Sequence, residues 1–284
     1  MTFRTRFAPS PTGPLHLGHA FSALTAYEAA RAAQGQFFLR MDDLDPSRAR
    51  PEWEAQIYDD LAWLGISWEA AVWHQSARLP RYRAALKRLW EMGLLYPCTC
   101  TRRDIQAAVS APQEGAPLHG PDGLIYPGTC RPETPPTGPM PEDAALRLDM
   151  ARACALAGSF SFEETGAGPE GQSGLITPEN LPQTVGDVIL ARRDMGAAYH
   201  LAIVIDDAEQ DITHVIRGRD LFDATQIHVL LQRLLEVPTP TYHHHRLVRD
   251  DAGKRLAKRD DARAIATYRA DGLTPRDIRM KVGL

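Results

Sequence analysis

The chain of 284 residues contains no apolar run approaching the ~18 residues that a membrane-spanning helix needs. Its first residues, MTFRTR, lead directly into folded-looking sequence and include no apolar leader segment. Neither sign of charge is in large excess, because the formal net charge is only −4. We therefore expect a cytoplasmic protein with no membrane partner, and overall charge does not indicate nucleic-acid binding.

Cysteine is scarce, with four residues in the whole chain. So few thiols without a secretion signal do not predict a disulfide framework. The spacing of Cys98, Cys100 and Cys130 is more typical of a structural Zn²⁺ site, with three reduced structural cysteines as the alternative. Spacing alone nominates His119 as the fourth ligand. Cys154 is expected to be a spare buried thiol.

The first residues of the chain alternate between strand-like and helical sequence. An apolar strand at residues 2–8, a glycine- and proline-rich loop, an alanine-rich helix and a second apolar strand at residues 37–41 form a βαβ unit. This order predicts an α/β fold with a parallel sheet.

Further elements follow from apolar spacing and turn residues. Helices are predicted at residues 52–64, 79–92 and 220–235, the last with Asp220 as its N-cap. Strands are predicted at residues 187–191, 199–206 and 212–218, as further strands of the parallel sheet. Proline and glycine concentrate between residues 96 and 174, which predicts a loop-rich insertion between two halves of one domain.

The loop RFAPSPTGPLHLGHA, residues 6–20, runs into the first predicted helix. Free N–H groups at a helix N-terminus suit a phosphate, and Gly18 removes a side chain where a ligand or another backbone must come close. His16 and His19 share one helical face and could donate hydrogen bonds to phosphoryl oxygens. Two histidines at this spacing could equally be metal ligands, or one core and one surface residue.

A second cationic element lies far away in sequence, in RDDAGKRLAKRDDA at residues 249–262. A cationic loop that closes over a polyphosphate would stabilise the charge on a departing pyrophosphate. By itself this segment could also be a solvated charged turn. Residues 246–284 contain eleven Lys and Arg against six Asp and Glu, which fits either a solvated tail or a surface for phosphates.

Taken together, these motifs resemble those of class I aminoacyl-tRNA synthetases. HLGH resembles their HIGH signature, and RLAKR resembles KMSKS with Arg255 in place of the first Lys and Ala257 in place of the Ser. The strings RFAPSPTGPLHLGHA, LRMDDLDPSR, YHLAIVIDD and VIRGRDL resemble the glutamyl-tRNA synthetase subgroup. The chain ends 25 residues after Arg259, which resembles the truncated glutamyl-queuosine tRNA(Asp) synthetases, whose members lack an anticodon-binding domain.

This resemblance implies a Rossmann-like catalytic domain interrupted by a zinc-containing insertion. The implied boundaries are residues 1–92 for the first half of that domain, 93–195 for the insertion, 196–245 for the second half, and 246–284 for the KMSKS-like loop and a short helical C-terminus.

The implied activity is that of a ligase. It would activate glutamate with ATP and Mg²⁺ without needing tRNA, and then join glutamate to the queuosine base at the wobble position of tRNA(Asp). The expected partners are glutamate, ATP and the queuosine-containing anticodon stem-loop, bound by a monomer. The alternatives are conventional glutamyl-tRNA charging without an anticodon domain, an inactive paralogue that binds tRNA or nucleotide, and a nucleotidyltransferase.

The resemblance also implies roles for individual residues. The glutamate pocket would be formed by Arg6, Phe7, Ala8, Pro9, Ser10, Asp42, Tyr199 and Arg217. Asp42 stands where the family usually has Glu and would bind the substrate ammonium, a role that Asp43 could share. Arg217 would pair with the side-chain carboxylate, which favours glutamate over glutamine because an amide would leave a desolvated cation unpaired.

ATP and zinc complete the implied site. ATP would be bound by His16, Gly18, His19, Arg255 and Lys258, of which His16, His19 and Lys258 would be catalytic. For zinc, the resemblance implies Tyr126 beside the three cysteines, where spacing alone nominated His119.

Overall fold

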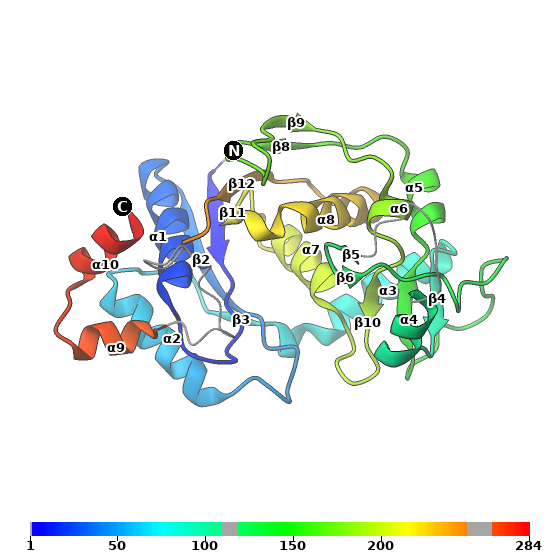
Figure 1. The fold of residues 1–284 in the computed structure, drawn as a ribbon, viewed down its shortest axis with the longest axis horizontal. Helices are drawn as coiled ribbons and strands as arrows, with labels where there is room; N and C mark the ends of the chain where they lie inside the picture. The colour runs from blue at the N-terminus through cyan, green and yellow to red at the C-terminus, as the bar shows by residue number, and fades with distance from the viewer. Residues whose placement is uncertain (1, 110–118, 249–262) are drawn as a thin grey trace.

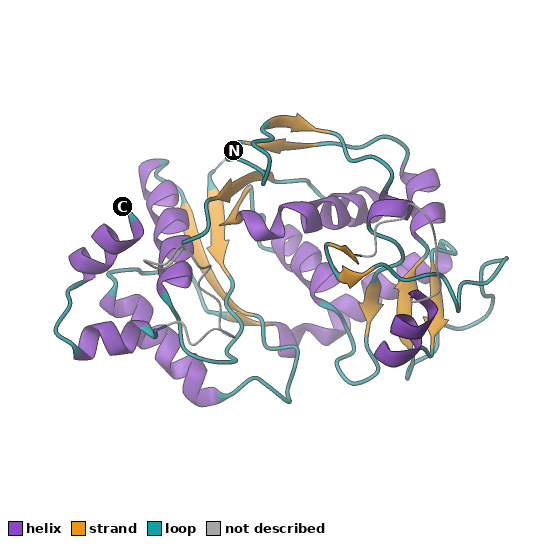
Figure 2. Ribbon diagram, in the orientation of Figure 1, coloured by secondary structure: helices purple, strands orange, loops and turns teal. Residues whose placement is uncertain are grey.

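The computed structural model describes residues 2–109, 119–248 and 263–284. Two groups of parallel strands lie at its centre (Figures 1 and 2). The first group is β1 (Arg4–Phe7), β2 (Gln36–Met41) and β3 (Trp73–His74), and the second is β11 (His214–Gly218), β12 (Thr241–His245) and β8 (Phe162–Glu164), with β9 (Gly174–Ile176) antiparallel at its edge. The backbone N–H of Thr213 donates to the carbonyl of Arg4 at 3.0 Å and ties the two groups together. The predicted α/β fold with a parallel sheet is confirmed.

Helices cover this sheet on both sides (Figure 1). On one side lie α1 (Leu17–Ala32), α2 (Pro51–Trp63), α9 (Ile265–Ala270) and α10 (Pro275–Val282), and on the other lie α7 (Tyr199–Glu209) and α8 (Phe222–Leu235). One apolar core joins β1 and β2 to α1, α2 and the two C-terminal helices. The predicted helices at 52–64 and 79–92 are present as α2 and α3 (Leu79–Glu91).

Residues 93–195, the range expected for the insertion, contain an antiparallel sheet of β4 (Leu95–Cys98), β7 (Ala145–Leu148) and β10 (Ile189–Ala191). The hairpin of β5 (His119–Gly120) and β6 (Gly123–Leu124) and three helices, α4 (Arg102–Val109), α5 (Met150–Ala157) and α6 (Leu181–Thr184), accompany it. A second apolar core joins this sheet and α5 to α3, α7 and α8. This antiparallel sheet therefore packs on α7 and α8, which also flank the parallel sheet, and β10 does not extend the parallel sheet as predicted.

The strand predicted at residues 199–206 is wrong, because these residues form helix α7. Every residue from His200 to Asp207 is buried, so α7 shows no polar face and no helical spacing of apolar residues. A short continuous apolar run rich in Ile and Val is typical of a buried strand as well as of a helix buried all round.

The N-cap predicted at Asp220 is also wrong. A short 3₁₀ turn, Arg219–Leu221, precedes α8, so that helix begins at Phe222 with Leu221 as its N-cap. The two-residue shift follows from this extra turn, which the apolar spacing does not distinguish from the helix proper.

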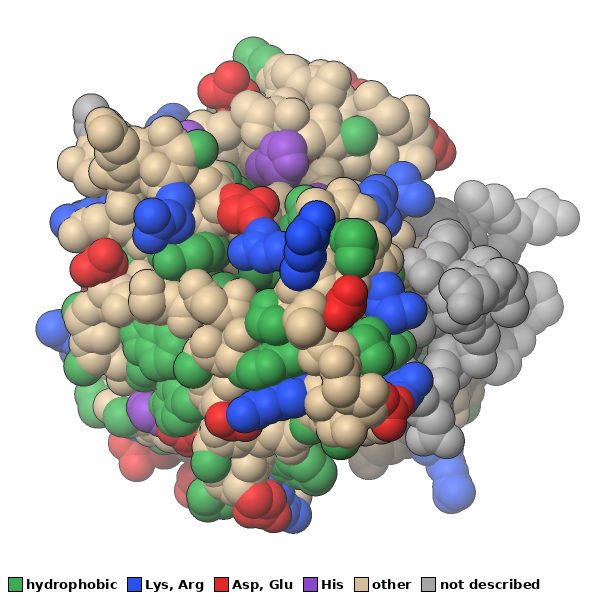
Figure 3. Space-filling model, turned by 90° about the vertical axis from the view of Figure 1, so that its left-hand side faces the viewer, with side chains coloured by type: hydrophobic (Ala, Val, Ile, Leu, Met, Phe, Trp, Pro, Cys, Tyr) green, Lys and Arg blue, Asp and Glu red, His purple; other side chains and the backbone are tan. Residues whose placement is uncertain are grey.

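The described part of the basic C-terminal tail is held by ion pairs. Arg269 pairs with Asp59 at 2.7 Å, and Arg279 pairs with Glu28 on α1. The face formed around these helices shows both signs of charge interspersed with apolar side chains (Figure 3). Arg269 and Arg279 therefore help to hold α9 and α10 against α2 and α1. No helix in the described ranges is long and apolar enough to cross a membrane.

Candidate active site

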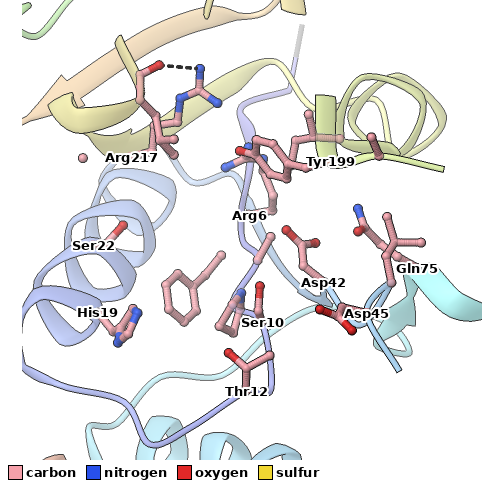
Figure 4. A pocket seen from close by; sticks show the side chains of 18 of the residues that line it. Arg6, Ser10, Thr12, His19, Ser22, Asp42, Asp45, Gln75, Tyr199 and Arg217 are labelled. Atoms are coloured by element: carbon pink, nitrogen blue, oxygen red, sulfur yellow. Dashed lines mark hydrogen bonds between the residues drawn. The ribbon is translucent and has the colours of Figure 1, made fainter. Parts of the chain in front are cut away.

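A cavity of about 620 Å³ lies where three parallel strands end, lined by Phe7 of β1, by Asp42 directly after β2 and by Gly218 of β11. In open α/β sheets the carboxyl ends of the strands are where ligands bind. The cavity brings together most of the predicted residues, namely Arg6, Phe7, Ala8, Pro9, Ser10, His19, Asp42, Tyr199 and Arg217. Figure 4 shows Arg217 and His19 on one side of the cavity and Asp42 on the other.

The two histidines form the cap of helix α1. His16 is the N-cap residue, and its Nδ1 accepts the backbone N–H of Gly18 at 3.1 Å. In return, Nδ1 of His19 accepts the backbone N–H of His16 at 3.2 Å. A ring nitrogen that accepts a hydrogen bond carries no proton, so in each neutral ring the proton is on Nε2. The cap therefore uses Nδ1 of both rings and places the proton of each neutral ring on Nε2.

The absence of a side chain at Gly18 makes room for the His16 ring. A Cβ at this position would lie 3.0 Å from Cε1 of the His16 ring, which is tighter than an ordinary contact. The glycine therefore lets the His16 ring fold back over the helix start. Neither His16 nor Gly18 lines the cavity itself, whereas His19 does.

Arg6 is buried beneath the cavity and already has a carboxylate partner. Its Nε and Nη2 donate to the two oxygens of Asp207 at 2.9 and 3.2 Å. Arg40 donates to the same carboxylate at 2.9 Å. Burial opposes ionisation of Asp207, but the two guanidinium groups hold its pKa below the ordinary value. The charge of Arg6 is therefore compensated within the protein.

Asp42 follows β2 and is almost fully buried. Its Oδ1 lies 3.8 Å from Nε of Arg40 and forms no hydrogen bond with any residue in the described ranges. Burial raises the pKa of Asp42 to about 7, with Arg40 opposing the shift. Asp43 does not line the cavity: its carboxylate accepts the N–H and the hydroxyl of Ser76 at 2.8 and 2.5 Å, which speaks against a role shared with Asp42.

Arg217 ends β11 and is 5% exposed. Unlike Arg6, it forms no ion pair with a carboxylate in the described part of the chain, and its Nη1 has no hydrogen-bond partner there. The side chain lines the cavity above Arg6 and Tyr199 (Figure 4). The cavity therefore contains a buried cation whose charge no direct contact neutralises.

Sequence reasoning missed the acidic pair that supports the cavity floor. Asp206, fully buried on α7, accepts hydrogen bonds from Gln75 at 3.1 Å, Arg78 at 2.7 Å and Tyr82 at 2.8 Å. Gln75 and a further arginine, Arg192, also line the cavity. The sequence signal for this pair was the position of Asp206 and Asp207 directly after an apolar run. Carboxylates buried there need hydrogen-bond partners elsewhere in the fold.

The family model described as "tRNA synthetases class I (E and Q), catalytic domain" matches residues 2–118 and 176–283. The glutamyl-Q tRNA(Asp) synthetase of Rhodobacter capsulatus is 61% identical over 281 residues, which cover 99% of each chain. That of Symbiobacterium thermophilum is 40% identical, covering 96% of this chain and 83% of the relative. The chain belongs to the glutamyl-Q tRNA(Asp) synthetase family.

A solved structure shares the fold of this family member. The glutamate tRNA ligase of Elizabethkingia meningosepticum, in complex with its amino acid, superposes with a TM-score of 0.77 at 26% identity. The alignment covers 99% of this chain but 60% of that one. The likeness therefore extends over the whole of this family member and leaves a large part of the longer ligase unmatched.

Outside the cavity, this family member contains a cluster of three cysteines. The Sγ atoms of Cys98, Cys100 and Cys130 lie within 4.8 Å of one another. The hydroxyl of Tyr126 lies 3.5 Å from Sγ of Cys98 and 3.4 Å from that of Cys100. His119 is exposed on β5 and is not part of the cluster. The four atoms converge as ligands of a single ion would.

Electrostatics at the cluster differ between two of its thiols, since the pKa of Cys130 is lowered whereas that of Cys100 is raised. Nε of Arg147 donates to Sγ of Cys98 at 3.3 Å, and its guanidinium lies 3.8 Å over the Tyr126 ring. Burial opposes ionisation of Cys130, but its hydrogen bond with Tyr126 lowers the pKa to about 6. The predicted ATP residues Arg255 and Lys258, and Ala257 between them, lie outside the described residues.

Proposed function

We propose that this protein activates glutamate with ATP and transfers it to queuosine in tRNA(Asp). The observation that carries the proposal is the buried, uncompensated Arg217 facing the cavity, in a chain 61% identical to a glutamyl-Q tRNA(Asp) synthetase. An uncompensated buried cation favours a substrate with an anionic side chain, because an uncharged amide would leave the cation desolvated and unpaired.

Glutamate would lie between the two sides of the cavity. Its side-chain carboxylate would pair with Arg217, and its ammonium would bind the carboxylate of Asp42 on the opposite side of the cavity (Figure 4). Tyr199 and residues 6–10 would surround the rest of the substrate. Because Arg6 is engaged with Asp207, its contribution would be to hold β1 and the pocket wall rather than to supply free charge.

The first step forms glutamyl-adenylate. An oxygen of the substrate α-carboxylate attacks the α-phosphorus of ATP, the bond to the β-phosphate bridging oxygen breaks, and pyrophosphate leaves. The Nε2–H groups of His16 and His19 would donate to phosphoryl oxygens at the start of α1. Lys258 and Arg255 would add positive charge, and Mg²⁺ would enter with ATP as part of the substrate.

The second step transfers glutamate. A queuosine hydroxyl attacks the acyl carbon of the adenylate, the acyl–phosphate bond breaks, and AMP leaves. This chemistry needs positioning and charge stabilisation rather than a protein nucleophile.

The cysteine cluster would hold a structural zinc ion. Three thiolates and the Tyr126 oxygen provide the four ligands that a closed structural site takes. When bound, the ion would tie β4 to the segment that contains Tyr126 and Cys130. It would have no part in either chemical step.

The decisive experiment uses labelled glutamate, ATP and two tRNA pools, one from cells that make queuosine and one from cells that cannot. We expect label only on the queuosine-containing pool. Equal labelling of both pools would indicate conventional tRNA charging. Absence of glutamate-dependent ATP–pyrophosphate exchange would indicate an inactive paralogue.

A further inference from the structure

The Arg217 guanidinium is held by neutral acceptors. Its Nε donates to Nε2 of His244 at 3.1 Å, and its Nη2 donates to Oγ1 of Thr225 at 2.7 Å and to Nδ1 of His228 at 3.2 Å. A third acceptor for Nη2 is the carbonyl of Leu221 at 3.3 Å (Figure 4). All of these groups come from β12, α8 and the turn before it, so the arginine is fixed from several directions.

Because arginine can only donate, its contacts fix the proton positions on both imidazoles. His244 accepts through Nε2, so its Nδ1 carries the proton and donates to the buried Glu164 carboxylate at 2.5 Å. His228 accepts through Nδ1, so its Nε2 carries the proton and donates to Nδ1 of His200 at 3.0 Å. Each imidazole thus accepts a hydrogen bond from Arg217 and, through its other ring nitrogen, donates one to a group farther away.

The series of hydrogen bonds that runs from Arg217 through His228 and His200 ends at the protein surface. With Nδ1 of His200 accepting, its proton lies on Nε2, which is 3.4 Å from Oδ1 of Asp122. Asp122 stands on the turn of the β5–β6 hairpin in the insertion, and its side chain is 45% exposed. The hairpin of the insertion therefore places a carboxylate at the far end of a chain that begins at Arg217.

We propose that His228 and His244 are positioning residues that fix Arg217 while leaving its charge uncompensated, and so determine the preference for glutamate over glutamine. The carboxylates along these contacts do not touch Arg217: Glu164 is separated from it by one imidazole and Asp122 by two. This inference rests on the proposed role of Arg217 in glutamate binding.

The comparison with Arg6 shows why neutral acceptors matter. A carboxylate directly on Arg217, like Asp207 on Arg6, would neutralise the guanidinium and compete with an incoming substrate carboxylate. An imidazole satisfies the N–H donor without adding negative charge. Burial and the positive charge of Arg217 lower the pKa of His228 well below its ordinary value, which keeps this ring neutral.

The test compares two substitutions at His228. Asparagine can place its Oδ1 close to the position of the imidazole Nδ1 and so keep an acceptor for Arg217, whereas leucine fills similar space without one. We expect His228→Leu to raise the glutamate KM in ATP–pyrophosphate exchange by about tenfold or more, the usual effect of losing a hydrogen bond to a charged group. The ratio of kcat/KM for glutamate over glutamine should fall by a similar factor, while the ATP KM changes by less than about twofold.

His228→Asn should recover most of that loss. If His228 served packing alone, the order would reverse, because leucine suits a buried apolar site better than asparagine. Asp122→Ala removes an exposed side chain and so tests the hydrogen-bond series from Arg217 to Asp122 even if His228→Leu does not fold. We expect Asp122→Ala to raise the glutamate KM by about threefold. His243→Asn is the matched control. His243 is adjacent to His244, but its Nδ1 forms a hydrogen bond with Thr165, which is not among the groups that contact Arg217.

The outcomes separate the two proposals. If the wild-type protein shows no glutamate-dependent exchange, the proposed function fails, and this inference fails with it. If wild-type exchange is normal but Asp122→Ala and the folded His228 variants keep the wild-type glutamate KM and selectivity, the glutamate site stands and the positioning role is overturned.

Discussion

The imidazole rings of His16 and His19 stack at the first turn of α1 with their centroids 3.8 Å apart. Each ring uses Nδ1 to accept a backbone N–H of the helix cap. The cap and the proposed phosphate contacts therefore depend on different atoms of the same side chains. Substitutions that replace one atom and not the other can separate stability from catalysis.

His19→Asn is such a substitution. The asparagine oxygen can accept the backbone N–H of His16, but no donor remains at the position of Nε2. We expect the variant to keep the wild-type thermal midpoint and to lower the rate of glutamate-dependent ATP–pyrophosphate exchange by about 10²–10³-fold, the usual cost of losing one preorganised donor. His19→Ala should lose the cap acceptor as well and about 1 kcal/mol of stability. A folded His19→Asn protein with near-normal exchange would exclude the phosphate contact.

Asp42 should bind the substrate ammonium. Asp42→Asn removes the negative charge but keeps the size of the side chain. We expect the glutamate KM to rise by about tenfold or more at pH 8, with little change in the ATP KM. Asp43→Asn is the matched control, because Asp43 caps the turn at Ser76 outside the cavity. Equal effects of the two substitutions would contradict the assignment.

The same carboxyl predicts a pH dependence. In the free protein the pKa of Asp42 is raised to about 7, so the group becomes protonated as the pH falls below 7. A bound ammonium favours the ionised form, so binding weakens where a proton must first be displaced. We expect the wild-type glutamate KM to rise between pH 8 and pH 6, and the Asp42→Asn profile to be flatter. Parallel profiles would show that another group titrates.

The cysteine cluster predicts about one zinc ion per chain in purified protein, measured by metal analysis. Cys100→Ser should abolish the zinc content and lower the thermal midpoint, since a structural ion contributes to folding. Cys154→Ser is the control, because this thiol lies outside the cluster. Zinc-free wild-type protein with normal stability would refute the site.

The fourth ligand can be decided separately. Tyr126→Phe removes the hydroxyl that lies 3.4 Å from Sγ of Cys100, whereas His119→Asn changes an exposed residue outside the cluster. We expect Tyr126→Phe to weaken zinc retention against a chelator by about 10-fold or more and His119→Asn to leave it unchanged. The opposite result would make His119 the ligand.

Much of the fold was predictable where local signals agree. The βαβ order, the loop before α1 and the spacing in α2 and α3 all predicted elements that the structure contains. Helix α7 was mistaken for a strand because it is buried on every side and so has no polar face to reveal its period. Apolar content predicted its burial but not its conformation.

The site was predictable only in its linear motifs. The histidine pair and the residues at strand ends could be nominated from short strings, and most of them line one cavity. The contact of His200 with His228 could not, because 28 residues separate them and the packing of α7 on α8 creates it. The pairing of Arg6 with Asp207 is equally invisible in the sequence, since its partners are 201 residues apart.

Away from the cavity residues, Asp60 on α2 is fully buried, and neither carboxylate oxygen forms a hydrogen bond with any residue that the structure describes. Burial, and then the charge of Asp59, raises the pKa of Asp60 to about 6. Because the folded pKa lies above the unfolded value, the folded chain binds more protons between about pH 4 and 6. Stability should therefore fall as the pH rises through this window, and the loss is complete above it.

Asp60→Asn removes the ionisation and should raise the free energy of unfolding at pH 8 by roughly 1–3 kcal/mol, because a buried polar group without a partner costs less than a buried charge. The advantage should vanish near pH 4, where the wild-type carboxyl is protonated in the folded state. Urea unfolding at both pH values measures this difference. Asp59→Asn is the control: it relieves only the smaller repulsion on Asp60 and removes the exposed ion pair with Arg269, so any gain should be well below that of Asp60→Asn. A variant no more stable than wild type at pH 8 would mean that the Asp60 charge is compensated.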